Sequence, residues 1–142
     1  MKIYVDTSFL VSLYSLDANS AAAARAMQSS PADRLLTAFG ELELFNALGL
    51  RLFRKEVTAR QAKSSLKDFE SDLRDGIFQL RVLPDSVFER ALRLSRQTTP
   101  RLGTRSADVL HVAAALELGV DYLYSFDERQ RKLARAVRLK LN

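Results

Sequence analysis

Short apolar segments of strand length alternate with longer helical segments along almost the whole of this 142-residue chain. The expected strands are residues 2–5, 35–37, 78–83, 122–125 and 137–141. The expected helices are residues 9–16, 17–28, 40–55, 58–74, 87–97, 107–118 and 128–136, with residues 98–103 as the one substantial loop. Because helices between strands make crossover connections, this alternation predicts an α/β fold: an α/β/α sandwich around a central, mainly parallel sheet of about five strands.

The sequence has no internal repeat, linker or low-complexity tract, so we expect a single domain over residues 1–142. It contains no cysteine, and therefore no disulfide can stabilise it. No apolar run approaches the ~20 residues of a transmembrane helix, and Asp6 comes too early for a signal peptide. We therefore expect a soluble, cytoplasmic protein that does not act at a membrane.

The chain is basic, with a formal net charge of +5 and a pI of about 9.8. Arginine greatly outnumbers lysine, and the guanidinium group binds phosphate through two parallel hydrogen bonds. This composition favours a partner that carries phosphates, such as a nucleic acid. A basic surface that serves only solubility is an equally good interpretation of the charge alone.

Four acidic residues stand at the ends of strands or near the starts of helices. Asp6 and Asp127 each follow an expected strand, and Asp108 lies in the first turn of the helix expected at 107–118. Glu43 lies within two turns of the start of the helix that follows strand 35–37. In an open parallel sheet the binding crevice lies beyond the carboxyl ends of the strands, so these acids can meet at one edge. A basic chain that gathers carboxylates there predicts a divalent-metal site facing a phosphodiester backbone, as in a nuclease.

Three of these acids also have ordinary structural interpretations. Asp127 with Gln130 three residues later resembles a helix capping box, and a capping residue can still bind a metal ion. Asp108 suits the positive end of a helix dipole, an effect worth ~0.3 to 1 kcal/mol. Asp6 after an apolar strand is out of place unless it caps the following helix.

For the fourth acid the sequence offers two neighbouring glutamates. Glu41 and Glu43 lie about 200° apart around a helix, so only one of them can face the crevice. Asn46 lies on the same face as Glu43, and this polar pair on an otherwise apolar helix favours Glu43.

Smaller polar residues beside the acids are weaker candidates. Ser8 and Ser125 can hydrogen-bond carboxylates or act as ordinary turn formers. His111, three residues after Asp108, is more often a packed structural histidine than a ligand. Arg105 precedes the helix expected at 107–118 and can meet a phosphate there.

The blocks that carry these residues resemble the successive motifs of PIN-domain proteins, especially the VapC-like toxins of prokaryotic toxin–antitoxin pairs. These blocks are Asp6-Thr7-Ser8-Phe9-Leu10-Val11, Glu43 with Asn46-Ala47-Leu48, residues 107–115 and residues 125–130. The last two blocks, with residues 116–121 between them, are the most specific, whereas residues 55–100 carry none of the motifs.

The resemblance implies a PIN-like sandwich and a Mg²⁺- or Mn²⁺-dependent ribonuclease whose acidic site is Asp6, Glu43, Asp108 and Asp127. Asp6 and Asp108 are the first candidates for direct metal ligands, and Glu43 and Asp127 would bind directly or through water. The residues expected to orient these carboxylates are Ser8, Asn46 and Ser125, and Arg105 is expected to contact RNA. The resemblance also implies a homodimer and a small antitoxin partner.

Two other classes of function compete with the nuclease. A phosphoryl-transfer hydrolase of the haloacid-dehalogenase kind needs a second aspartate two residues after Asp6, where this chain has Ser8. A non-catalytic PIN-like module that binds RNA or protein remains the main alternative. The helix over residues 39–53 is apolar around more of its circumference than one core-facing stripe requires, which predicts a protein-binding surface.

Overall fold

The computed structural model describes residues 1–29 and 31–142. Its strands are β1 (Lys2–Val5), β2 (Asp33–Thr37), β3 (Gln79–Arg81), β4 (Tyr122–Tyr124) and β5 (Lys140–Leu141). They form one five-stranded sheet in the order β3-β2-β1-β4-β5, and every neighbouring pair is parallel. The predicted α/β fold with a parallel sheet of five strands is therefore confirmed.

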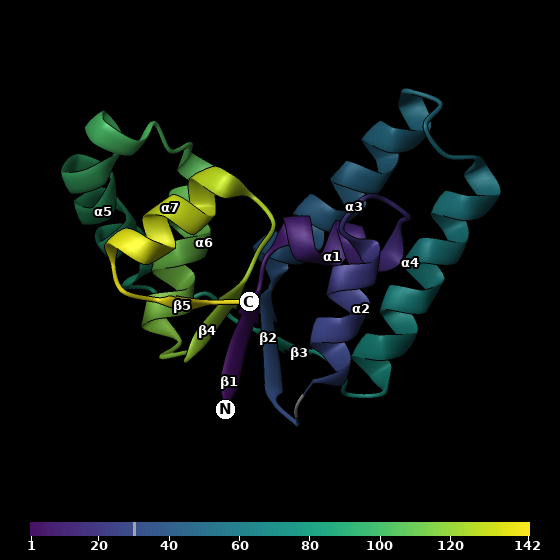
Figure 1. Ribbon diagram of the computed structural model, residues 1–142, viewed down its shortest axis with the longest axis horizontal. Coiled ribbons are helices and arrows are strands. Elements are labelled where there is room, and N and C mark those ends of the chain that lie inside the picture. The colour runs from purple at the N-terminus through teal and green to yellow at the C-terminus, as the bar shows by residue number, and fades with distance from the viewer. Residues whose placement is uncertain (30) are drawn as a thin grey trace.

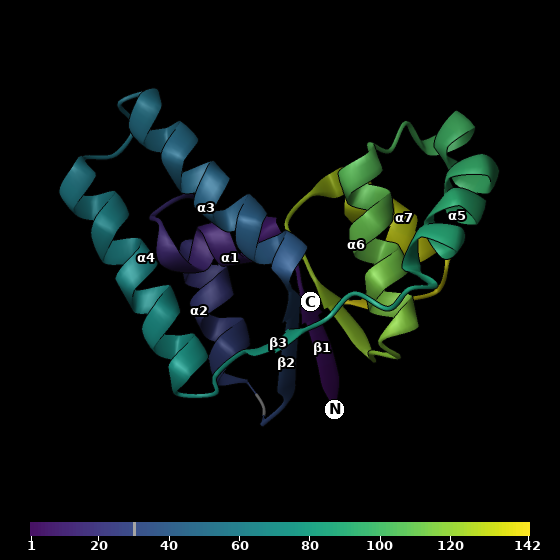
Figure 2. The ribbon, with the colours of Figure 1, turned by 180° about the vertical axis from the view of Figure 1, so that it is seen from behind.

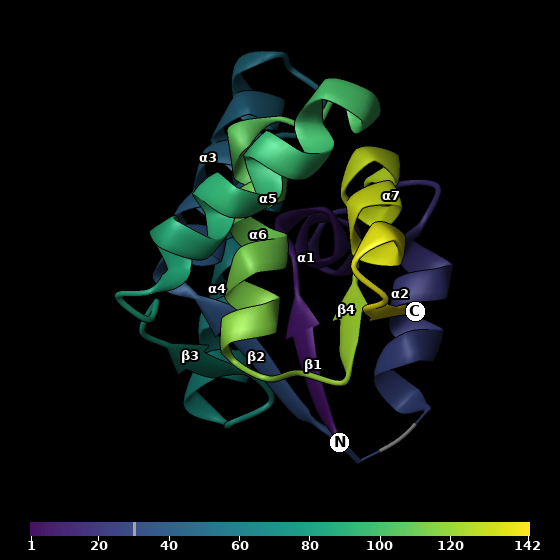
Figure 3. The same cartoon turned by 90° about the vertical axis from the view of Figure 1, so that its left-hand side faces the viewer.

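Helices cover both faces of this sheet. They are α1 (Thr7–Tyr14), α2 (Ser20–Gln28), α3 (Ala38–Phe53), α4 (Ala59–Arg74), α5 (Val87–Leu102), α6 (Ser106–Glu117) and α7 (Glu128–Ala136). Helices α1 to α4 lie on one side of the sheet and α5 to α7 on the other, as the two opposite views show (Figures 1 and 2). The side view places α5, α6 and α7 in front of the strands, with the other helices behind them (Figure 3).

Side chains that alternate along the central strand divide the interior into two cores. Ile3 and Val5 belong to the core under α1, α3 and α4, whereas Tyr4 belongs to the core under α5, α6 and α7. This alternation is the period of two expected of a strand that is covered on both faces. It leaves Ile3, Tyr4 and Val5 buried in the middle of the sheet, which fixes the position of Asp6 at the carboxyl end of β1.

The order of the strands creates a crevice at their carboxyl ends. From β1 the chain crosses to β2 on one side, and β4 pairs with β1 on the other side. Such a reversal of strand order opens the sheet edge to a ligand. Asp6, Thr37 and Asp127 lie at this edge and begin α1, α3 and α7 as N-cap residues.

The loop predicted at residues 98–103 is wrong, because α5 continues to Leu102. Thr98 donates its hydroxyl hydrogen to the carbonyl oxygen of Leu94 (2.6 Å), so it does not interrupt the helix. Pro100 removes only one N–H from the last turn. Gly103 ends the helix with a left-handed φ of 65°.

The last strand is also shorter than predicted, since Val137 caps α7 and only Lys140–Leu141 pair with β4. Among the described residues, no helix is long and apolar enough to cross a membrane.

Candidate active site

The four predicted acids line one pocket at the carboxyl edge of the sheet. Its volume is about 240 Å³. Its lining residues are Asp6, Thr7, Ser8, Glu43, Arg105, Ala107, Asp108, His111, Asp127 and Gln130. The structure therefore brings together side chains that lie up to 124 residues apart in the sequence.

Asp6 is the most buried of the acids, with a relative exposure of 1%. Its carboxylate caps α1 by accepting from the backbone N–H of Phe9 (2.8 Å). It also accepts from the Ser8 hydroxyl (2.7 and 2.9 Å) and from Nε2 of Gln130 (2.5 Å). Burial nevertheless raises the pKa of Asp6 above its ordinary value, because an ionised carboxylate is costly away from water.

Glu43 reaches the pocket from α3, and two donors hold the same oxygen of its carboxylate. Nε2 of His111 lies 2.5 Å from Oε2, and the Thr7 hydroxyl lies 2.6 Å from it. Burial alone would raise the pKa of Glu43, but these hydrogen bonds outweigh it and the pKa lies below its ordinary value. Glu43 lines the pocket and Glu41 does not, so the structure agrees with the predicted facing of this helix.

Asp108 lies in the first turn of α6, where its Oδ2 accepts from the backbone N–H of Arg105 (2.8 Å). Burial raises the pKa of Asp108, and the nearby charge of Asp127 raises it further. Asp127 caps α7 by accepting from the backbone N–H groups of Arg129 (2.9 Å) and Gln130 (3.1 Å). The predicted capping box is incomplete, since the Gln130 amide bonds Asp6.

The predicted supporting residues fall into two groups. Ser8 and Ser125 lie beside the carboxylates: Oγ of Ser8 accepts from the backbone N–H of Asp127 (3.2 Å), and so does Oγ of Ser125 (3.1 Å). Arg105 is exposed at the rim of the pocket. Asn46 is exposed on α3, and among the described residues it is not one of those that line the pocket.

The carboxylate oxygens that line the pocket are the donor type that a hard cation prefers. Among the described residues, no group of three His, Asp or Glu side chains is positioned to bind a single ion. The hydrogen bonds of Glu43, Asp108 and Asp127 all use one carboxylate oxygen, which leaves the second oxygen of each for a ligand. An all-oxygen donor set of this kind fits Mg²⁺ or Mn²⁺, and Mg²⁺ usually keeps several of its waters.

Sequence reasoning missed Thr7 and Gln130 and treated His111 as structural. The spacing of three residues between Asp108 and His111 placed them on one helix face and was an available signal. Nothing in the sequence pairs Gln130 with Asp6, because their contact depends on how α7 lies over the sheet edge.

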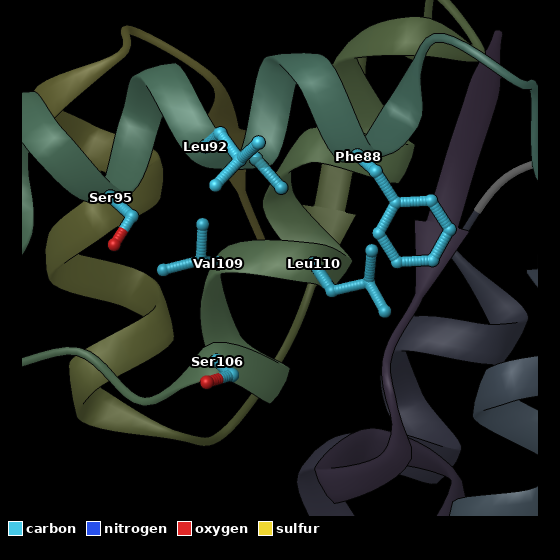
Figure 4. A pocket seen from close by; sticks show the side chains of 7 residues that line it. Phe88, Leu92, Ser95, Ser106, Val109 and Leu110 are labelled. Atoms are coloured by element: carbon cyan, nitrogen blue, oxygen red, sulfur yellow. The ribbon is translucent and has the colours of Figure 1, made fainter.

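A second hollow, of about 350 Å³, lies between α5 and α6 (Figure 4). Its walls are Phe88, Ala91, Leu92, Ser95, Ser106, Val109 and Leu110. They include no ionisable side chain, so this hollow has no groups for acid–base or metal chemistry.

The family of the chain follows from a comparison with known domains. A family model of the PIN domain matches residues 3–136, which is nearly the whole chain. The chain belongs to the PIN domain family. No curated protein matches the sequence of this PIN domain.

Solved structures share the fold of this PIN domain at low sequence identity. VapC20 of Mycobacterium tuberculosis, a toxin that cleaves the sarcin–ricin loop, superposes with a TM-score of 0.70 at 20% identity over 92% of this chain and 93% of that chain. VapBC2 of Rickettsia felis, solved with a DNA fragment from its promoter, superposes with a TM-score of 0.68 at 16% identity, over 100% of this chain and 98% of that chain. FitAcB of Neisseria gonorrhoeae superposes with a TM-score of 0.64 at 15% identity, over 98% of this chain and 95% of that chain.

Proposed function

We propose that this PIN domain is a metal-dependent endoribonuclease that hydrolyses RNA phosphodiester bonds. The observation that carries the proposal is the convergence of Asp6, Glu43, Asp108 and Asp127 on one pocket at the carboxyl edge of a parallel sheet. Each acid comes from a different element, and burial raises the pKa values of Asp6 and Asp108, a feature that clusters at functional sites.

Asp6 and Asp108 are the proposed direct ligands of Mg²⁺ or Mn²⁺, with Glu43 and Asp127 bound directly or through water. When bound, the cation supplies positive charge that polarises the phosphodiester and the attacking water. The protein holds the carboxylates in place: Ser8 and Gln130 fix Asp6, and the backbone of Arg105 fixes Asp108. Water attacks the phosphorus in line with the leaving oxygen, so no covalent nucleophile is required.

The distribution of charge supports a polyanionic substrate on one side of the pocket. Residues 87–142 contain 11 Arg and Lys against six Asp and Glu, whereas residues 1–86 contain 11 of each. The net positive charge therefore belongs to the part of the chain that forms α5, α6, α7 and β5. Arg105, at the rim, is the proposed first contact with an RNA phosphate.

We further propose that the protein is a toxin with a small antitoxin partner. VapBC2 and FitAcB, which share its fold, are two-component assemblies by name. The proposed antitoxin surface is the outer face of α3, where Leu42 and Phe53 are 65% and 83% exposed. An antitoxin segment that carries a few apolar side chains would bury Leu42 and Phe53.

A homodimer would use the opposite side of the molecule. Phe88 and Leu92 are 61% and 62% exposed on α5, and both line the apolar hollow shown in Figure 4. We propose that a second copy covers this face. A protein that sediments as a monomer at micromolar concentration would contradict this part of the proposal.

Cleavage of total RNA tests the enzyme against its main rival, a non-catalytic RNA- or protein-binding module. We expect cleavage that stops with a chelator and returns with Mg²⁺ or Mn²⁺. Glu43→Gln should lower the rate at least 100-fold, whereas the matched control Glu41→Gln on the same helix should keep nearly full activity. Cleavage that resists the chelator would exclude the metal mechanism, and no cleavage with either metal would favour the binding module.

A further inference from the structure

The single histidine of the chain lies beneath the proposed active site, with a relative exposure of 2%. It comes from α6, three residues after Asp108, and both of its ring nitrogens are engaged. Nε2 lies 2.5 Å from Oε2 of Glu43, and Nδ1 lies 2.9 Å from the hydroxyl of Tyr4. Since neither nitrogen is free, His111 is not placed to bind a cation directly.

The direction of the hydrogen bond to Glu43 is determined by its acceptor. An ionised carboxylate has no hydrogen to donate, so Nε2 of His111 must carry the hydrogen of this bond. The Tyr4 hydroxyl meets the opposite nitrogen and also lies 3.3 Å from Oγ1 of Thr37. Thr37 is the N-cap of α3, the helix that carries Glu43.

This chain of hydrogen bonds therefore starts and ends on one helix. It runs from the beginning of α3 through β1 and α6 and returns to Glu43 within the second turn of α3. Ring packing holds the histidine from two sides, with Tyr4 at 5.7 Å and Phe39 at 5.0 Å between ring centroids. The imidazole consequently has a fixed position relative to α3.

Thr7 adds a second donor from another element. Its hydroxyl lies 2.6 Å from the same Oε2 atom of Glu43 that His111 contacts. Two donors on one oxygen restrict the orientation of the carboxylate, and Oε1 is the other oxygen of this pocket-lining side chain. Without them, a glutamate side chain on a helix surface rotates about three bonds.

We propose that His111 is a positioning residue, which together with Thr7 holds Glu43 in the orientation from which Oε1 reaches the cation, and that Tyr4 fixes the imidazole from behind. This inference rests on the proposed function, because it assigns a reason for the orientation of one of its four carboxylates. Hydrogen-bond partners of ligating side chains typically change metal affinity or activity by about 10- to 100-fold when they are removed.

Four variants separate positioning from packing. His111→Leu and Thr7→Val each remove a donor to Glu43, and Tyr4→Phe removes only the hydroxyl behind the imidazole. His111→Gln keeps an N–H donor and serves as the conservative rescue. The matched control is Tyr14→Phe, which removes a partly buried hydroxyl, the donor to Asp72, at the opposite end of α1 from Thr7.

Titration calorimetry with Mn²⁺ provides a readout that does not depend on cleavage. We expect His111→Leu and Thr7→Val to weaken Mn²⁺ binding by about 10- to 100-fold, Tyr4→Phe by a smaller factor, and His111→Gln to regain most of the affinity. Tyr14→Phe should lower the melting temperature and leave Mn²⁺ affinity unchanged. If His111→Leu does not fold, Thr7→Val at the edge of the pocket still decides the question.

Rates on a short RNA that spans a mapped cleavage site complete the test. A loss in kcat, with little change in KM, is expected for His111→Leu and Thr7→Val. Parent-like Mn²⁺ affinity and kcat in both variants would overturn the inference while leaving the nuclease intact. A parent that binds Mn²⁺ but cuts no RNA would overturn the proposed function, and weaker Mn²⁺ binding by the variants would still support the positioning role.

Discussion

At the scale of single residues, the acids of this pocket do two things at once. Asp6 and Asp127 satisfy the first N–H groups of α1 and α7, and they also face the shared cavity. Their capping role explains why each stands between a strand and the helix that follows it. Asp6, Asp108 and Asp127 were predictable from position alone. The contact of Gln130 with Asp6 was not predictable, because the two residues lie 124 positions apart and meet only in the folded chain.

The first prediction concerns the cost of burying Asp6 without a cation. Asp6→Asn keeps a good helix cap and removes a carboxylate whose pKa burial has raised. In the presence of a chelator, we expect this variant to be as stable as the parent or more stable, by up to about 2 kcal/mol. The free energies of unfolding of the variant and the parent, measured by urea denaturation with chelator, check this prediction. A large loss of stability would show that Asp6 is mainly structural.

A second prediction follows from the signs of the pKa shifts. Asp6 and Asp108 have raised pKa values, so as the pH falls from neutral toward the ordinary carboxyl range they bind protons in the folded state first, and the metal-free protein should gain stability. Glu43 has a lowered pKa, so its contribution is lost only below its ordinary value of 4.5. Melting temperatures in chelator should therefore rise over this range. The Asp6→Asn, Asp108→Asn double variant should show a flatter profile.

At the scale of helices and strands, the alternation of apolar segments predicted the order and type of every element. The main error was at residues 98–103, where Pro100 and Gly103 suggested a loop. The helix tolerates Pro100 because only one hydrogen bond is lost in its last turn, and because α5 packs against α6 while its last residue, Leu102, packs against the core. Such packing depends on the tertiary structure, so the local signals of Pro100 and Gly103 predicted an end of α5 that is too early.

The end of α5 gives a third prediction. Gly103 has a φ of 65°, a conformation that an L side chain adopts only with strain. We expect Gly103→Ala to destabilise the protein by about 1 to 2 kcal/mol. The control is Gly49→Ala on α3, where an added Cβ meets nothing within 4 Å and higher helix propensity should stabilise by about 0.5 to 1 kcal/mol. Equal effects of the two changes would contradict this explanation of the helix end.

At the scale of the whole molecule, the acidic pocket lies between a part without net charge, residues 1–86, and a basic part, residues 87–142. The N-terminal 86 residues carry no net charge, and the whole excess of +5 belongs to residues 87–142. A polyanion would therefore approach from the side of α5, α6 and α7, and release of its counterions would dominate its affinity. The net charge was evident from the sequence, whereas its position relative to the pocket required the fold.

This arrangement gives a fourth prediction. In the Asp108→Asn background, which we expect to bind RNA without cutting it, Arg105→Ala should weaken RNA binding and reduce the slope of log affinity against log salt by about 1. Lys63 is exposed on α4, in the part of the chain without net charge. Lys63→Ala should therefore leave both the RNA affinity and the salt slope nearly unchanged. Fluorescence anisotropy at several salt concentrations measures this. Equal effects of the two changes would contradict a substrate path on the basic side.

The central claim is that carboxylates from four elements act together as one divalent-cation site, and a calorimetric Mn²⁺ titration tests it most directly. The parent should bind Mn²⁺ in a saturable manner, and Asp6→Asn or Asp108→Asn should weaken that binding at least 10-fold. Asp85→Asn, which removes an exposed acid outside the pocket, should bind like the parent. Parent-like binding by both pocket variants, or no saturable binding by the parent, would contradict the account.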